Sequence, residues 1–235
     1  MKKNLESIPP NPVWNVWQGL LLILLVTLAE LPIGWLNSQQ DLSLQSGLLR
    51  FLAVGFGDCL LYFLVVFLFL RWLKCGWRDL GFVRAGKPSA YWGGVLTGVI
   101  LFVAVGLLGN VLTKLVGTPV PQTFAEAVKG VAYGWEYLLL LLLGGVVAPL
   151  KEEMIFRGLI YPPLRSALGA GKGILVNGIF FAALHVDIIR FLPLFLGGVV
   201  LTWLYERTKS IWPSVLAHGT WNILMAVALW IQKVG

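Results

Sequence analysis

Charged side chains are scarce in this sequence: Asp, Glu, Lys and Arg together make up 12% of its 235 residues. Soluble domains carry about 25%. Apolar residues reach 58% and the mean hydropathy is +0.82, which excludes an ordinary soluble globular domain. The length suffices for about seven helical spans with short connections. We therefore predict an all-α fold, a polytopic transmembrane helical bundle that forms a single integral membrane domain over residues 1–235.

Cysteine is also rare, and basic residues are not clustered. Cys59 lies in an apolar run and Cys75 in a short polar connection, so a disulfide framework and a cysteine-based metal site are both excluded. The net charge of +7 is not gathered into basic patches on polar elements. It therefore indicates membrane topology and contact with lipid, and we expect no nucleic-acid partner.

Seven apolar stretches predict the spans, and tryptophans such as Trp14, Trp17 and Trp35 are expected at the membrane interface. The predicted spans are residues 14–35, 48–72, 91–116, 135–148, 174–186, 188–205 and 211–231. A cytoplasmic N-terminus places thirteen Lys and Arg residues inside and five outside, as the positive-inside rule favours. This orientation predicts that Glu152 and Glu153 lie near the cytoplasmic face. Residues 71–87 are predicted to lie on the membrane surface.

Two adjacent carboxylates, Glu152 and Glu153, follow an apolar run. Such charges are costly beside hydrocarbon unless they are paired or face a wet cavity. On a helix Glu153 and Arg157 lie within reach of a salt bridge, whereas Glu152 points about 100° away. One carboxylate can thus be neutralised while the other stays available for chemistry. Pro149 is placed to begin a new or redirected helix just before them. The alternative is a charge cluster that only caps a helix.

The two histidines of the chain, His185 and His218, both lie in predicted spans. Each has a partner four residues away on the same helix face, Phe181 for His185 and Asn222 for His218. His218 and Asn222 can donate to a developing negative charge, and a Glu with a nearby His can act as a general base on water. These groups are suited to hydrolysing a peptide bond with an activated water. The alternative is that each histidine is a hydrogen-bonded packing residue.

Other catalytic motifs are missing. The sequence contains neither a G-x-S-x-G elbow nor an H-E-x-x-H zinc motif. Glu152, His185 and His218 could still bind zinc with an open position. Glu30 and Asp58 are further acids inside predicted spans, where an acid is expected to line a cavity or to pair with a Lys or Arg of a neighbouring helix.

The order of the motifs E-E-x-x-F-R-G, F-x-x-x-H and H-x-x-x-N resembles the CPBP family of intramembrane proteases. That family includes type II CAAX prenyl endopeptidases and Abi-like bacteriocin-processing or immunity proteins. The motifs lie in a predicted protease core at about 135–232, as Glu152–Gly158, Phe181–His185 and His218–Asn222. The resemblance implies that Glu152, assisted by His185, activates the water and that His218 and Asn222 form the oxyanion hole. It also implies a supporting role for Glu153, Phe156, Arg157 and Phe181.

The predicted function is that of an intramembrane endopeptidase acting on membrane-associated peptides, with prenylated CAAX-type substrates among the candidates. A metal-free mechanism is favoured, because the four candidate catalytic residues supply a base and two donors without a cofactor. Membrane lipid and a peptide or lipidated peptide are the expected partners. The expected location is a bacterial-type plasma membrane, as a multi-pass protein. The alternative is a non-catalytic membrane partner or bacteriocin-immunity-type protein that uses the same polar cluster for binding. A transporter is disfavoured, because the sequence has no internal repeat.

Overall fold

In the computed structural model of the chain, residues 12–38, 44–117 and 123–234 are described, apart from the side chains of 29–38, 44–46 and 234. Every regular element in these ranges is helical, which confirms the predicted all-α fold. The elements are α1 (Val16–Ser38), α2 (Leu44–Trp72), η1 (Trp77–Leu80), α3 (Ser89–Val116), α4 (Thr123–Gly130), α5 (Gly134–Leu142), η2 (Leu143–Val147), α6 (Ala148–Glu153), η3 (Met154–Ile160), α7 (Tyr161–Ala183), α8 (Phe191–Thr208) and α9 (Ile211–Val234).

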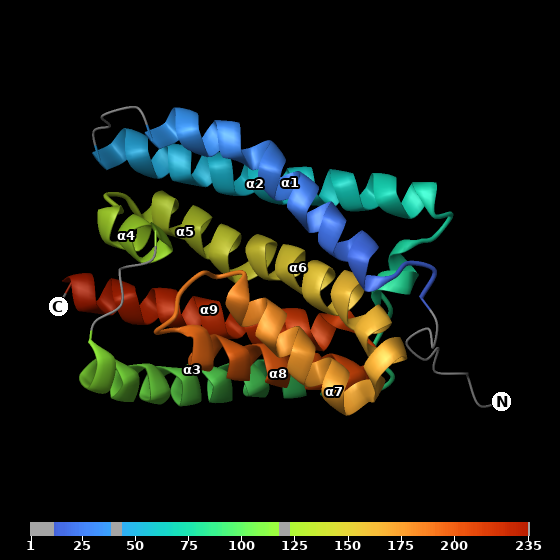
Figure 1. Ribbon diagram of the computed structural model, residues 1–235. Coiled ribbons are helices and arrows are strands. Elements are labelled where there is room, and N and C mark those ends of the chain that lie inside the picture. Colours follow the sequence, from blue (N-terminus) through green and yellow to red (C-terminus); the bar gives the residue numbers. More distant parts are fainter. Residues whose placement is uncertain (1–11, 39–43, 118–122, 235) are drawn as a thin grey trace.

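The long helices lie side by side along one common direction (Figure 1). α1 and α2 form one side of the bundle, α3 forms the opposite side, and α5, α6 and α9 lie between them. α3 packs along α9, and α7 packs along α8. The motif-bearing helices are therefore enclosed by other helices on several sides.

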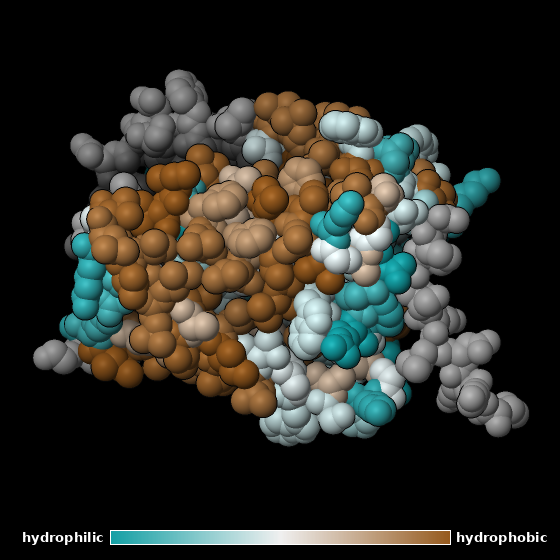
Figure 2. Space-filling view, turned by 60° about the horizontal axis from the view of Figure 1, so that its bottom comes forward, coloured by the Kyte–Doolittle hydropathy of each residue, from teal (hydrophilic) through white to brown (hydrophobic). Residues whose placement is uncertain are grey.

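Among the described residues, three helices are long and apolar enough to cross a membrane: Gly47–Trp72, Ser89–Val116 and Ile211–Lys233. Figure 2 shows a broad apolar surface along the flank of the bundle, with hydrophilic residues gathered toward its ends. Such a surface is unfavourable in water and suits the hydrocarbon of a bilayer. The chain is an integral membrane protein. The total of about seven spans and the cytoplasmic N-terminus stay predictions.

Trp14 and the short helix η1, both predicted to lie at the membrane surface, pack against the bundle. Trp14 is buried, and its indole Nε1–H donates to the carbonyl oxygen of Leu159 at 2.8 Å. Leu80 of η1 is also buried, and a Cβ on Gly158 would lie 3.1 Å from the Leu80 Cβ. The absence of a side chain on Gly158 lets η1 approach η3. By contrast Trp17 is exposed, as predicted for an interfacial tryptophan.

The helix that carries the two carboxylates is continuous from Gly134 into α7, and it widens twice to π-helical geometry, in η2 and in η3. Pro149 lies in the first turn of α6, as predicted, but the residues before it are already helical, so α6 continues from η2 and is not a separate helix. Further along, α7 is kinked at Gly169, which has φ +77°. π-Turns are rare and recur at functional sites.

Charged groups between α7 and α8 form a second polar cluster. Arg165 donates to both carboxylate oxygens of Glu206, at 2.9 and 3.1 Å. Tyr161 and Lys209 donate to the same carboxylate. Burial raises the pKa of Glu206, but the hydrogen bonds from Arg165, Lys209 and Tyr161 outweigh it and hold that pKa below its ordinary value. This cluster joins the ends of two helices.

The close packing of α3 on α9 depends on glycine, and this gives a testable prediction. A Cβ on Gly98 would lie 2.4 Å from the carbonyl oxygen of Ala217, whereas one on Gly93 would have nothing within 4 Å. We expect Gly98→Ala to destabilise the bundle by about 1–3 kcal/mol, the usual cost of overpacking. Gly93→Ala, the matched control, should stabilise it by up to about 1 kcal/mol, because alanine favours helix. Thermal unfolding in detergent measures both, and equal shifts would contradict the prediction.

Candidate active site

Glu153 and Arg157 form an ion pair whose two side chains are fully buried. The Arg157 Nη1 donates to Glu153 Oε1 at 2.9 Å, as the four-residue spacing predicted. The Arg157 Nη2 donates to the carbonyl oxygen of Gly198 in α8 at 3.0 Å. The rings of Phe156 and Phe181 lie 5.8 and 5.0 Å from the guanidinium. Because the two charges are buried together, neither carries the full cost of an isolated ion in a low-dielectric interior.

His218 of α9 lies between the two carboxylates. Its Nδ1 is 2.8 Å from Glu153 Oε1, and its Nε2 is 3.7 Å from Glu152 Oε2. An ionised carboxylate can only accept a hydrogen bond, so Nδ1 carries the hydrogen in the contact with Glu153. The other ring nitrogen is thereby left on the side of Glu152.

Glu152 has a different environment from Glu153. Its side chain is 23% exposed, compared with 0% for Glu153. It lines a cavity of about 810 Å³, and its Oε2 is buried without a hydrogen-bond partner among the described residues. A buried polar atom without a partner usually indicates a site for water or a ligand. The structure thus separates a bound carboxylate from an open one, as the sequence predicted.

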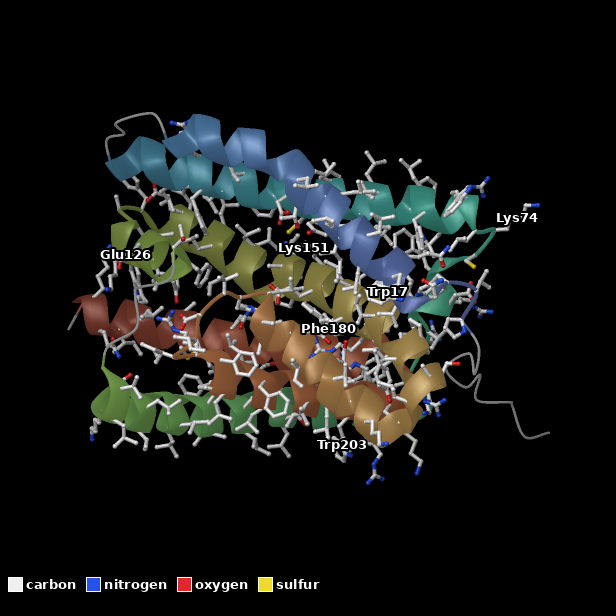
Figure 3. The ribbon with its side chains drawn as sticks, viewed as in Figure 1. Trp17, Lys74, Glu126, Lys151, Phe180 and Trp203 are labelled. Carbon is white, nitrogen blue, oxygen red and sulfur yellow. The ribbon has the colours of Figure 1, made fainter. Side chains whose placement is uncertain are left out.

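The cavity lies among α2, α3, α4, α6, α8, α9 and the turn that follows α7, and Glu152, His185, His218 and Asn222 all line it. Its volume is in the range of ligand-binding sites. Lys151, the neighbour of Glu152, lies near the middle of the long axis of the bundle (Figure 3). The helix that carries the two glutamates continues through the bundle beyond them, and their place near the cytoplasmic face stays a prediction.

His185 lies in the turn after α7 and not within a helix. Its Nδ1 is 2.7 Å from the carbonyl oxygen of Phe181. The Phe181 ring contacts both histidine rings, with centroid distances of 4.9 Å to His185 and 5.8 Å to His218. No hydrogen bond or ion pair joins His185 to Glu152, two residues that the structure describes. The two line the same cavity, and Phe181 lies between the two histidines.

Asn222 ties α9 to the wide turn η2 while it lines the cavity. Its Nδ2 donates to the carbonyl oxygen of Gly144 at 2.9 Å. An amide nitrogen carries two hydrogens, so one remains for a ligand. Close contact of the two elements requires glycine here, because a Cβ on Gly219 would lie 2.3 Å from the carbonyl oxygen of Gly145. Nothing in the sequence indicated this bond.

A second ion pair faces the cavity. The Lys151 Nζ of α6 donates to Asp58 Oδ2 of α2 at 2.5 Å, and both residues line the cavity. The expectation that Asp58 lines a cavity or pairs with a basic residue of another helix is confirmed on both counts. The side chain of Glu30, the other acid of that prediction, lies outside the described residues. Sequence reasoning did not identify Lys151 as part of the site.

The predicted zinc donors do not converge in this arrangement. Among the residues that the structure describes, no group of three or more His, Cys, Asp and Glu side chains is placed to hold a metal ion. Glu152 and His218 are neighbours, but the His185 ring is held by the Phe181 carbonyl. Cys59 and Cys75 form no disulfide bond. Metal dependence thus stays a question for experiment.

Comparison with known proteins identifies the part of the chain that builds this site. Residues 134–224 match the family model described as type II CAAX prenyl endopeptidase, Rce1-like. This segment is similar to that family. The resemblance predicted from the three motifs is therefore confirmed, and the Rce1-like segment contains every predicted site residue. The matched family is one of endopeptidases, so the match supports a protease kind of function.

Three relatives are similar to the chain. "Putative membrane peptidase YdiL" of Bacillus subtilis is 29% identical over 89 residues, which cover 38% of this chain and 36% of the relative. "UPF0177 protein YxdF" of Lactococcus lactis is 26% identical over 86 residues, 36% of this chain and 47% of the relative. The matches thus span less than half of these two relatives. An uncharacterized 24.3 kDa protein of Escherichia coli is 29% identical over 209 residues, 84% of this chain and 91% of the relative. No solved structure matches the chain.

Proposed function

We propose that this chain is an intramembrane endopeptidase in which Glu152 activates a water molecule to hydrolyse a peptide bond. The observation that carries the proposal is the difference between the two carboxylates. Glu153 is fully buried and bound to Arg157 and His218, whereas Glu152 is 23% exposed and lines the cavity without a Lys or Arg partner. The Rce1-like match over the same helix supports it.

In the proposed reaction Glu152 takes a proton from the water while the water oxygen attacks the carbonyl carbon of the substrate. The His218 Nε2–H and the second amide hydrogen of Asn222 donate to the resulting oxyanion. This role uses the imidazolium form of His218, in which Nδ1–H is donated to Glu153 and Nε2 also carries a hydrogen. The C–N bond then breaks, and the leaving amine takes the proton from Glu152.

His185 assists from another wall of the cavity. A backbone carbonyl can only accept, so the His185 Nδ1 donates to Phe181 and its Nε2 is left as an acceptor. In this role Nε2 accepts a hydrogen bond from the attacking water and orients it toward the substrate. Phe156 and Phe181 support the site through their contacts with Arg157 and with the histidine rings.

The substrates proposed are membrane-associated peptides, and prenylated CAAX-type peptides are the first to test because the matching family acts on them. A cavity at mid-depth of an apolar bundle suits a substrate that reaches the site from the bilayer. We further propose a multi-pass protein of a bacterial-type plasma membrane, with membrane lipid and a peptide or lipidated peptide as its partners.

The proposal predicts cleavage by the purified protein without an added metal. A fluorogenic CAAX-type peptide and a mixed library of membrane peptides serve as substrates, each with and without chelator. We expect wild-type cleavage that chelator does not change, and a loss of about 10²- to 10³-fold in His218→Ala, the usual effect of removing an oxyanion donor. Loss with chelator that zinc restores would assign Glu152 and His218 to a metal site. A wild-type protein that cleaves no peptide would overturn the proposal.

A further inference from the structure

The ion pair of Asp58 and Lys151 lies in the same cavity as Glu152 but has no part in the proposed chemistry. We propose that this pair is a substrate-positioning site that binds a neutral main-chain peptide group of the substrate, close to the bond that is hydrolysed. The inference rests on the proposed function and adds to it the residues that place the substrate.

The position of the pair supports this role. Lys151 directly precedes Glu152, so both project from the same turn of α6 into the cavity. The side chains of Lys151 and Asp58 are 17% and 20% exposed, so the pair is accessible from the cavity. The Lys151 Nζ also lies 4.9 Å from the centre of the Tyr62 ring. Contacts from α2 therefore hold the ammonium group beside the open carboxylate.

The pair has unused hydrogen-bonding capacity of both kinds. Asp58 Oδ1 is buried and has no partner among the described residues, while Oδ2 accepts from Lys151. A lysine ammonium has three hydrogens, and Asp58 takes one of them. Free donors next to a free acceptor match the C=O and N–H of a peptide group. Natural proteins leave few buried polar atoms unsatisfied, so the orphan oxygen indicates that a ligand or water completes it.

The charges around the cavity favour a neutral ligand. Asp58 is neutralised by Lys151, and Asp187, at the rim, is neutralised by Arg190. Glu152 is the one described carboxylate of the lining that has no Lys or Arg partner. An anionic ligand would be repelled by Glu152, and a cationic ligand that binds Asp58 would have to displace Lys151 from it. A peptide group avoids both penalties, and a charged pair kept inside a membrane protein is by default functional.

The test asks whether the pair of Asp58 and Lys151 binds one particular peptide N–H of the substrate. Starting from a peptide that the wild type cleaves, a series is made in which each peptide has one amide near the cleavage site replaced by an ester, which lacks the N–H. Binding is measured in the Glu152→Gln background, with the pair intact or replaced by Asp58→Leu and Lys151→Met. We expect one ester position to weaken binding about tenfold or more when the pair is intact, and less than about twofold when it is apolar.

Two further variants keep the result interpretable. Glu126→Gln with Lys129→Met removes an exposed ion pair of 3.4 Å outside the cavity and should leave the ester effect unchanged. If the protein with Asp58→Leu and Lys151→Met does not fold, the Asp58→Asn variant is used in its place. Its amide oxygen is a neutral acceptor, so the ester at the same position should weaken binding less than in the protein with the pair intact. An equal ester effect with and without the pair, or none at any position, would overturn the site while wild-type cleavage keeps the proposed function. A wild type that neither binds nor cleaves peptide would overturn both.

Discussion

Glu152→Gln is expected to reduce peptide cleavage by about 10²- to 10⁴-fold, the usual contribution of a general base. The amide has nearly the shape of the carboxylate but cannot take a proton from water. Glu152 makes no hydrogen bond through its buried Oε2, so the change should leave the fold intact. Single-turnover cleavage of a peptide substrate, compared at equal amounts of folded protein, measures the loss.

The control for this prediction is Glu126→Gln in α4. Glu126 is exposed and pairs with Lys129 outside the cavity. The Glu126→Gln variant should therefore cleave peptide at the rate of the wild type. A Glu152→Gln protein that keeps full biological activity would instead favour the non-catalytic alternative, in which the polar cluster only binds a partner. The same result in a cleavage assay would exclude Glu152 as the base.

The second large effect concerns the stability of the buried pair. Replacing one member, in Glu153→Leu or Arg157→Met, leaves the other charge buried without its partner, and we expect each to lower the free energy of unfolding by about 3–5 kcal/mol. Replacing both should restore most of that loss, because an apolar pair of similar volume needs no desolvation. Denaturant or thermal unfolding in detergent micelles measures all three variants.

Cleavage by the double variant separates stability from chemistry. His218 donates to Glu153 at 2.8 Å, so the apolar pair removes the acceptor that orients the ring. We expect a folded protein with strongly reduced cleavage. The exposed pair of Glu126 and Lys129 is the control, because such pairs contribute about 0–1 kcal/mol. A double variant as unstable as the sum of its singles would show that the two charges are not coupled.

The sequence predicted those parts of the site that depend on spacing within one helix. The contact between Glu153 and Arg157 follows from a separation of four residues, and so do the positions of His218 and Asn222 at one cavity. The all-α fold follows from composition and apolar periodicity. Each of these depends on local geometry, which the order of residues determines directly.

Contacts between distant segments could not be predicted in the same way. Asp58 and Lys151 are 93 residues apart, and Trp14 reaches Leu159 across 145 residues. His185 was expected within a span, but the chain leaves the helix at Ala183. The two π-turns alter the direction of side chains around α6, and the spacing of residues along the sequence does not indicate them. Tertiary packing decides all four features.

The position of Lys151 near the middle of the bundle has a consequence for the length of substrate. The hydrocarbon core of a bilayer is about 30 Å thick, so a site at mid-depth is about 15 Å from either surface. An extended peptide advances about 3.4 Å per residue, so under the proposed function about four to five residues would have to enter before a peptide bond reaches Glu152. A substrate peptide with fewer residues than this inside the bilayer would stay uncut. A thicker bilayer would require a longer inserted segment of the substrate.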